Sequence, residues 1–134
     1  MKIEGGCHCG RIAYEAVVEP GSAGICHCTD CQALTGSAYR VTIPAPAESF
    51  VLRGEPRIYI KTADSGAKRA HAFCPDCGAP IYAAAIVDPV TYSLRLGSIK
   101  QRARLGAPRR QISCQSALPW SMDLSGIAKA AKQT

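Results

Sequence analysis

Three cysteines within six residues constrain this chain more than any other feature. They lie in the stretch Cys26-His27-Cys28-Thr29-Asp30-Cys31, and two further pairs flank it, at Cys7-His8-Cys9 and at Cys74-Pro75-Asp76-Cys77. Neighbouring cysteines in a CxC segment cannot easily reach disulfide geometry with each other, but they can surround one metal ion. Seven of the eight cysteines are clustered in this way, and we interpret them as ligands for zinc.

The spacing of the cysteines indicates how they divide between two zinc ions. A CxC or CxxC pair has enough slack to supply two ligands of one tetrahedral site. The economical partition gives one closed, structural site made of four thiols, which are Cys7, Cys9, Cys74 and Cys77. The remaining three, Cys26, Cys28 and Cys31, would hold a second zinc with its fourth position open, as in catalytic sites. Alternatively Cys114, or an aspartate or histidine, fills that position.

Length, charge and hydropathy narrow the class of protein. We expect the 134 residues to form a single domain, 1–134. No apolar run is long enough for a bilayer and no signal peptide is recognisable, so we expect a cytoplasmic protein with reduced thiols and no membrane partner. The formal charge of +6 falls to about +3 once both zinc sites are filled. The basic segment 102–110 lacks aromatic residues, so we expect no nucleic-acid partner.

Alternating apolar and polar residues predict a mainly β fold. Strands are expected at residues 12–18, 37–43, 69–73, 80–87 and 92–96, with Pro44-Ala45-Pro46 as a break after the second of them. Residues 50–52 and 57–60 have the pattern of a hairpin. The pattern around residues 124–132 predicts a short amphipathic helix.

A short helical turn is expected directly after the cysteine triple. Residues 32–34 have helical composition, and Thr29 or Asp30 could cap the turn at its start. Gly36 is expected to end it.

Three motifs together resemble the glutathione-dependent formaldehyde-activating enzyme family. The motifs are Gly6-Cys7-His8-Cys9-Gly10, then Cys26-His27-Cys28-Thr29-Asp30-Cys31-Gln32 with Thr35-Gly36-Ser37, then Phe73-Cys74-Pro75-Asp76-Cys77-Gly78, and Pro119-Trp120 fits the family's ending. The resemblance implies a β-tent of stacked antiparallel sheets, with a structural zinc on the four-cysteine set and a catalytic zinc on Cys26, Cys28 and Cys31. One departure is visible, because Gln111-Ile112 stands where the family often has His-Ile.

The same resemblance implies an activity. The family's reaction adds the thiol of glutathione to formaldehyde and gives S-hydroxymethylglutathione, formally a carbon–sulfur lyase reaction run backwards. The expected partners are therefore a small-molecule thiol and an aldehyde, with zinc as cofactor and glutathione as co-substrate. An open zinc site suits this chemistry, because it can hold a substrate thiol deprotonated at neutral pH. The alternative is a non-catalytic zinc module for protein interaction, which a fourth ligand such as Cys114 would favour.

Glutathione carries two carboxylates, so basic side chains should line its cleft. The candidates are Arg40, Arg53, Arg57 and Arg95, and Trp120 is expected either in the core or at the border of the cleft. We expect His8 and His27 to point away from the metals, with His27 as a candidate proton shuttle. His71 is expected to be an ordinary strand residue.

Overall fold

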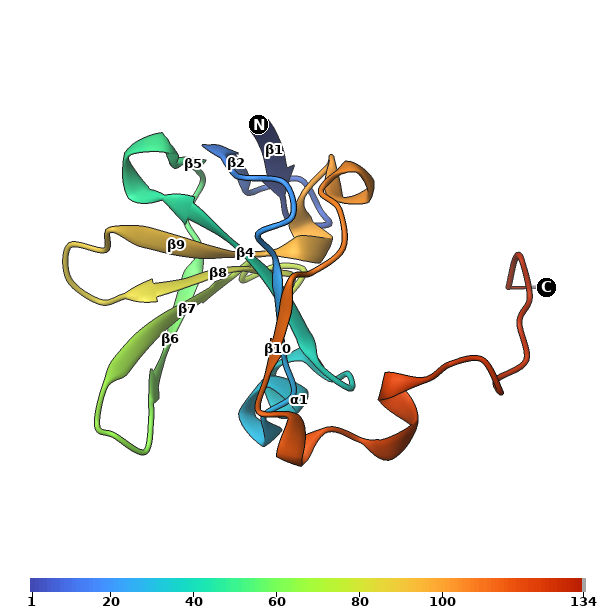
Figure 1. Ribbon diagram of the computed structural model, residues 1–134. Helices are drawn as coiled ribbons and strands as arrows, with labels where there is room; N and C mark the ends of the chain where they lie inside the picture. The colour runs from blue at the N-terminus through green and yellow to red at the C-terminus, as the bar shows by residue number, and fades with distance from the viewer. Residues whose placement is uncertain (134) are drawn as a thin grey trace.

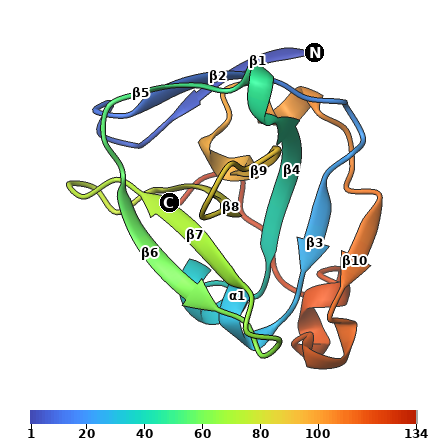
Figure 2. The ribbon, with the colours of Figure 1, turned by 90° about the vertical axis from the view of Figure 1, so that its left-hand side faces the viewer.

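The computed structural model describes residues 1–133, which form two β-sheets and one short α-helix. The smaller sheet has the order β1-β2-β5, formed by β1 (Lys2–Gly6), β2 (Ala13–Val17) and β5 (Val51–Arg53). The larger sheet has the order β10-β3-β4-β9-β8-β7-β6. Its strands are β10 (Arg110–Ile112), β3 (Gly24–Cys26), β4 (Arg40–Pro46), β9 (Thr91–Arg95), β8 (Pro80–Ala85), β7 (Lys68–Phe73) and β6 (Arg57–Thr62). The smaller sheet lies across one end of the larger, and α1 (Thr29–Thr35) lies at the other end (Figures 1 and 2).

The predicted mainly β fold with antiparallel sheets is confirmed. The strand pairs are antiparallel except β3 with β10, which run parallel and bring the segment after residue 109 beside the cysteine triple. Single-turn 3-10 helices connect the strands at Ala47–Ser49, Leu96–Ser98 and Arg102–Arg104, and two more follow β10 at Cys114–Ser116 and Pro119–Met122. Within the described residues, no helix combines the length and apolar character needed to cross a bilayer.

The apolar core lies between the two sheets. Ile3 and Tyr14 of the smaller sheet and Ile43 and Leu94 of the larger are each at most 1% exposed and belong to one cluster. Side chains alternate between the two faces of a strand. Because Ile43 and Leu94 face the core, their strand neighbours, including Arg95, face the other side of the larger sheet.

The predicted hairpin between residues 50–52 and 57–60 is wrong. β5 pairs with β2 in the smaller sheet, whereas β6 pairs with β7 in the larger one. Gly54 stands at the crossover with a φ of 93°, and a β-carbon there would lie 2.5 Å from the carbonyl oxygen of Arg11. The segment therefore passes from one sheet to the other where the sequence pattern predicted a simple turn.

Two other local predictions are also wrong. β4 does not break at Pro44 but continues to Pro46. Beyond Thr42 it pairs with β9 on one side only, and a proline costs less where the other side of the strand is unpaired. Residues 124–132 form no helix. Leu124 and Ile127 are 53% and 51% exposed, and the segment leads away from the two sheets (Figure 1). A short helix with no surface to pack against is not stable.

Candidate metal centres and the adjoining cavity

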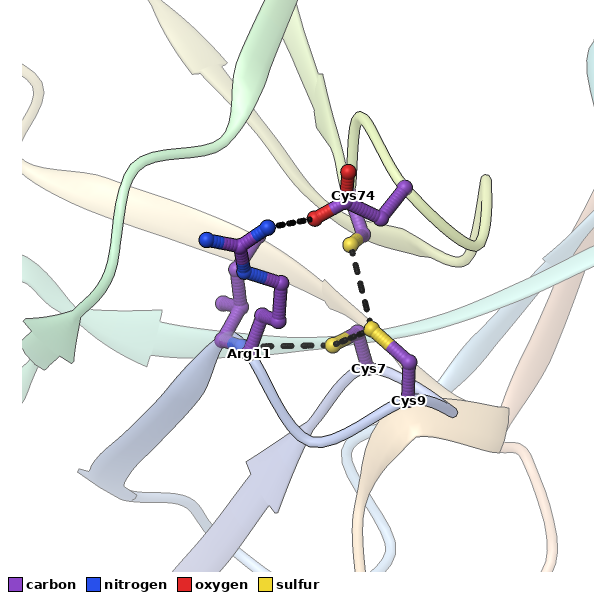
Figure 3. A network of polar contacts seen from close by, with 6 residues as sticks. Cys7, Cys9, Arg11 and Cys74 are labelled. Carbon is purple, nitrogen blue, oxygen red and sulfur yellow. Dashed lines mark hydrogen bonds and ion pairs between the residues drawn. The ribbon is translucent and has the colours of Figure 1, made fainter.

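Four thiols from distant parts of the chain meet where β1 and β7 end. Cys7, Cys9, Cys74 and Cys77, here called the four-cysteine cluster, have all their sulfur atoms within 4.8 Å of one another. The Cys9 Sγ atom lies 3.6 Å from that of Cys7 and 3.7 Å from that of Cys74 (Figure 3). Tetrahedral zinc with Zn–S bonds of about 2.3 Å spaces its sulfur ligands about 3.8 Å apart. The four thiols therefore fit one zinc ion with a complete set of ligands.

Both segments of the four-cysteine cluster are tight turns that end in a left-handed glycine. Gly10 and Gly78 directly follow the second cysteine of each pair, with φ values of 87° and 77°, a conformation that glycine adopts without strain. Backbone N–H groups point at the sulfur atoms, as at Cys7 Sγ, which accepts one at 3.2 Å. Such N–H groups also lower the pKa of Cys77 to about 6. At Cys77 these N–H groups thus favour the thiolate form that zinc requires.

An ion pair joins the two turns on the outside of the cluster. Arg11 Nη1 lies 2.7 Å from Asp76 Oδ2, and both side chains are largely exposed (Figure 3). Such a surface pair contributes little to stability. Cys74, by contrast, is fully buried and belongs to the apolar core. Stability at this point therefore depends chiefly on the cluster and the core.

A second cluster forms where β3 leads into α1. Cys26, Cys28 and Cys31, here called the three-cysteine cluster, also have their sulfur atoms within 4.8 Å of one another. Cys28 is the N-cap of α1 in place of the predicted Thr29 or Asp30, because its Sγ atom accepts the N–H of Cys31 at 3.3 Å. The predicted end at Gly36 is confirmed, with a φ of 66°. The start of the helix is thus built from the metal-binding motif itself.

The close approach of three thiols in the three-cysteine cluster favours the binding of a cation. Burial raises the pKa of the Cys31 thiol to about 12, and contacts with Cys28 and Cys26 raise it as well. Three thiols this close resist joint ionisation until a positive ion lies between them, and sulfur ligands suit zinc. Among the described residues no further cysteine, histidine or carboxylate brings a ligand atom into this group. Cys114 is exposed and outside it.

Hydrogen bonds fasten the three-cysteine cluster to the segment around β10. Gln32 Nε2 donates to the carbonyl oxygens of His27 at 2.9 Å and of Ser116 at 3.0 Å. His27 is 1% exposed, and its Nε2 atom lies 2.7 Å from Oε1 of Gln111. The backbone N–H of His27 also donates to the backbone carbonyl oxygen of Ile112 at 3.1 Å. His27 therefore has a structural role between two ligands, in agreement with its predicted orientation away from the metal.

A cavity of about 310 Å³ adjoins the three-cysteine cluster, and every strand of the larger sheet contributes to its lining. The sheet therefore wraps around this cavity, and Figure 2 shows its strands following an arc from β6 to β10. Strand register explains which side chains meet there. Cys26 is directly opposite Arg40, and Thr42 is opposite Arg95; opposite residues share one face of a sheet. The cavity face is therefore the side opposite the apolar core.

The lining of this cavity is strongly basic. Its cationic residues are Arg40, Lys61, Arg69, Arg95 and Arg110, and it contains no aspartate or glutamate. Lys61 is bonded to Asp30 of α1 at 3.1 Å, which raises the pKa of the lysine. Arg40 and Arg95 are only 6% and 7% exposed, and the Nε atom of each is buried with no hydrogen-bond partner among the described residues. The cavity thus presents unneutralised positive charge beside the three thiols.

His71 is part of this basic lining, although the sequence suggested an ordinary strand residue. Its Nδ1 atom lies 3.1 Å from a terminal guanidinium nitrogen of Arg95. Because arginine can only donate, Nδ1 is the acceptor and carries no proton. Burial, followed by the positive charge of Arg95, lowers the pKa of His71 to about 4. His71 is therefore neutral at physiological pH and holds Arg95 in place.

The structure separates the predicted substrate-binding residues. Arg40 lines the cavity, and so does Arg95. Arg53 instead lies 3.5 Å from Glu15 on the surface of the smaller sheet, and Arg57 is exposed on β6. Trp120 is 55% exposed. These last three residues line neither this cavity nor a larger one of about 680 Å³ beside the four-cysteine cluster.

Sequence reasoning missed the cavity residues Lys61, Arg69 and Arg110. A signal for two of them exists in the turn Asp64-Ser65-Gly66, which joins β6 and β7 and sets Lys61 opposite Arg69. The assumption that β6 pairs with residues 50–52 concealed it. Arg110 required knowledge of the parallel pairing of β10 with β3.

Two thiol clusters compatible with zinc, carried on a two-sheet scaffold, define the class of β protein to which this chain belongs. A family model described as "Glutathione-dependent formaldehyde-activating enzyme" matches residues 2–116. The chain belongs to this family, as its cysteine motifs predicted. A crystal structure of a Rhodobacter sphaeroides protein is similar, with a TM-score of 0.60 and 20% sequence identity, and the match covers 81% of this chain and 98% of that one. At this identity the likeness shows the fold alone.

Proposed function

We propose that this protein is a zinc-dependent enzyme of the carbon–sulfur lyase type. It adds glutathione, or a similar thiol, to formaldehyde or another small aldehyde, and with glutathione and formaldehyde the product is S-hydroxymethylglutathione. The observation that carries this proposal is the different number of cysteine ligands in the two clusters. The three-cysteine cluster has one ligand fewer than the four-cysteine cluster and adjoins a basic cavity. An incomplete ligand set beside a cavity is typical of catalytic zinc.

Each part of the cavity has a role in this proposal. Zinc held by Cys26, Cys28 and Cys31 would supply a Lewis acid that keeps a substrate thiol deprotonated at neutral pH. Other cations of the lining, Arg69 and Arg110, offer guanidinium groups to the carboxylates of the thiol substrate. Lys61, held by Asp30 at 3.1 Å, faces the same cavity and can stabilise negative charge that develops on the aldehyde oxygen.

The reaction needs no oxidant or reductant. A carbon–sulfur bond forms between the thiolate and the aldehyde carbon, and the π electrons of the carbonyl move to its oxygen. That oxygen takes up a proton equivalent to the one released by the thiol. The chain therefore has only to bind, orient and stabilise charge, which its cationic lining suits.

Exchange NMR would test the proposal, because it measures the rate of interconversion between free thiol and adduct at equilibrium. The zinc-loaded protein should accelerate exchange between glutathione with formaldehyde and S-hydroxymethylglutathione. Cys28→Ser should reduce this acceleration by about 100-fold or more, since it removes a ligand of the catalytic site. Cys114→Ser is the matched control, because this thiol is exposed and lies outside both clusters.

Zinc content gives a readout independent of activity. Titration with glutathione should make one of two zinc ions accessible to a chelator and leave the other protected. No acceleration by protein that holds two zinc ions, together with no effect of glutathione on either ion, would instead favour a non-catalytic zinc module.

A further inference from the structure

We infer that the aldehyde substrate itself carries a carboxylate next to its carbonyl group, and that the guanidinium groups of Arg40 and Arg95 bind this carboxylate. The inference rests on the proposed function and names the substrate class for the same site. A neutral aldehyde such as formaldehyde offers the two arginines nothing to bind. In glyoxylate the carboxylate is bonded directly to the aldehyde carbon, so its negative charge lies next to the reacting carbon.

Burial of the two arginines is the first argument. Arg40 and Arg95 are more than nine-tenths buried, and each has an Nε atom without a partner. A buried charge is costly unless it is paired. Burial and the neighbouring charge of Arg40 also lower the pKa of Arg95 to about 9. A bound anion would relieve both the desolvation and the mutual repulsion of these side chains.

Strand register provides the second argument, because it places this charge beside the reacting sulfur atoms. Cys26 on β3 is directly opposite Arg40 on β4, and Arg95 on β9 is opposite Thr42, the next residue on the same face. Directly opposite β-carbons lie about 5 Å apart. An anionic group held here is therefore adjacent to the three-cysteine cluster, where a carboxylate bonded to the carbonyl carbon would lie.

The balance of charge is the third argument. Within residues 1–133, four cations of the lining have no carboxylate partner, namely Arg40, Arg69, Arg95 and Arg110. A zinc ion with three thiolates contributes a net charge of about −1, and glutathione as a thiolate contributes about −2. About one positive charge is left over when the thiol is bound. A second substrate with one carboxylate would neutralise it, whereas a neutral aldehyde would not.

His71 and the small residues of the cavity complete the site. The bond from Arg95 to Nδ1 of His71 fixes the guanidinium with one terminal nitrogen occupied. Other N–H groups of Arg95 are left for the two oxygens of a carboxylate, the geometry that arginine favours. Thr42, Ala83 and Ser93 also line the cavity, and their small side chains leave room for a compact ligand. The carboxylate stays intact in the reaction, because only the aldehyde carbon forms a bond to sulfur.

The test compares glyoxylate with glycolaldehyde, a neutral aldehyde of similar size, and with formaldehyde. Exchange NMR on the zinc-loaded protein, corrected for the spontaneous rates, should show a preference for glyoxylate over glycolaldehyde of about tenfold or more. Arg95→Gln should lower the glyoxylate rate about tenfold more than the formaldehyde rate. Arg110→Gln should also reduce the ratio of the glyoxylate rate to the formaldehyde rate. Arg109→Gln is the matched control, because the side chain of Arg109 lies outside the cavity lining.

Calorimetry supplies a readout that does not depend on turnover. Glycolate should bind the zinc-loaded protein and ethylene glycol should not, and Arg95→Gln should abolish the heat of glycolate binding. If Arg95→Gln loses its cooperative melting, Arg40→Gln replaces it in both experiments.

The outcomes distinguish this inference from the proposed function. Turnover of formaldehyde with no preference for glyoxylate over glycolaldehyde would overturn the inference and leave the proposed function standing. A preference for glyoxylate that persists in Arg95→Gln and Arg40→Gln would also overturn it. Failure of all three aldehydes to react faster than without protein would overturn both.

Discussion

The two thiol clusters use the same ligand chemistry in different surroundings. The four-cysteine cluster joins two segments that are far apart in the sequence, and one of its members, Cys74, is packed into the apolar core. The three-cysteine cluster comes from a single stretch of six residues and adjoins a cavity lined by cations. The first cluster therefore closes a long loop of the chain, whereas the second leaves the topology unchanged and faces a cavity.

Under the proposed function, this difference would keep one zinc ion fixed and leave the other open to a substrate. Ligands drawn from distant segments make metal binding part of folding. Ligands drawn from one short segment can be supported locally, and here Gln32 supports them through bonds to His27 and Ser116. Loss of the metal should then have unequal consequences at the two sites.

The largest expected effect comes from breaking the four-cysteine cluster. Cys74→Ser should unfold the protein already near room temperature, so that heating shows no cooperative transition. The variant removes a fully buried ligand from a site whose metal binding contributes about 10 kcal/mol or more in small zinc domains. Circular dichroism during heating, together with zinc content, would measure this. Cys28→Ser is the matched comparison and should still melt cooperatively with one zinc bound. Equal melting of both variants would erase the distinction between the clusters.

A smaller effect, on the pH dependence of stability, tests the basic surroundings of the three-cysteine cluster. His71 has its pKa lowered to about 4 in the folded protein, against about 6.5 in an unfolded chain. The folded state then binds fewer protons below pH 6.5, so this histidine should make the protein lose stability as the pH falls from about 6.5 towards 4. Because the side chain is only half-buried, we expect less than about 1 kcal/mol between pH 7.5 and 5.5.

Urea unfolding at these two pH values, with zinc held constant, would measure this difference. His71→Gln should lose less stability over the same interval than the unchanged protein. An equal loss in both proteins would mean that burial and the cations of the cavity together do not lower the pKa of His71 in the folded protein.

The cysteine spacing was enough to predict both clusters and the family, because ligands separated by one or two residues can hardly reach different metals. The cavity was harder to predict. Arg40 and Arg95 were candidates only as basic residues, since their shared face depends on β4 pairing with β9. Lys61 and Arg110 lie on the two outermost strands of the larger sheet and meet only because that sheet wraps around the cavity. Such curvature is a property of the whole sheet and leaves no local pattern in the sequence.

The smallest expected effect is at Cys114, and it tests whether the three-cysteine cluster is truly open. This thiol was the alternative fourth ligand, yet it is exposed on a single-turn helix and its sulfur atom is not part of the cluster. Cys114→Ser should therefore retain two zinc ions per chain and the melting temperature of the unchanged protein. Zinc analysis after dialysis against a mild chelator would show this. Loss of one zinc in this variant would mean that Cys114 closes the second site, and the two clusters would then differ in location but not in kind.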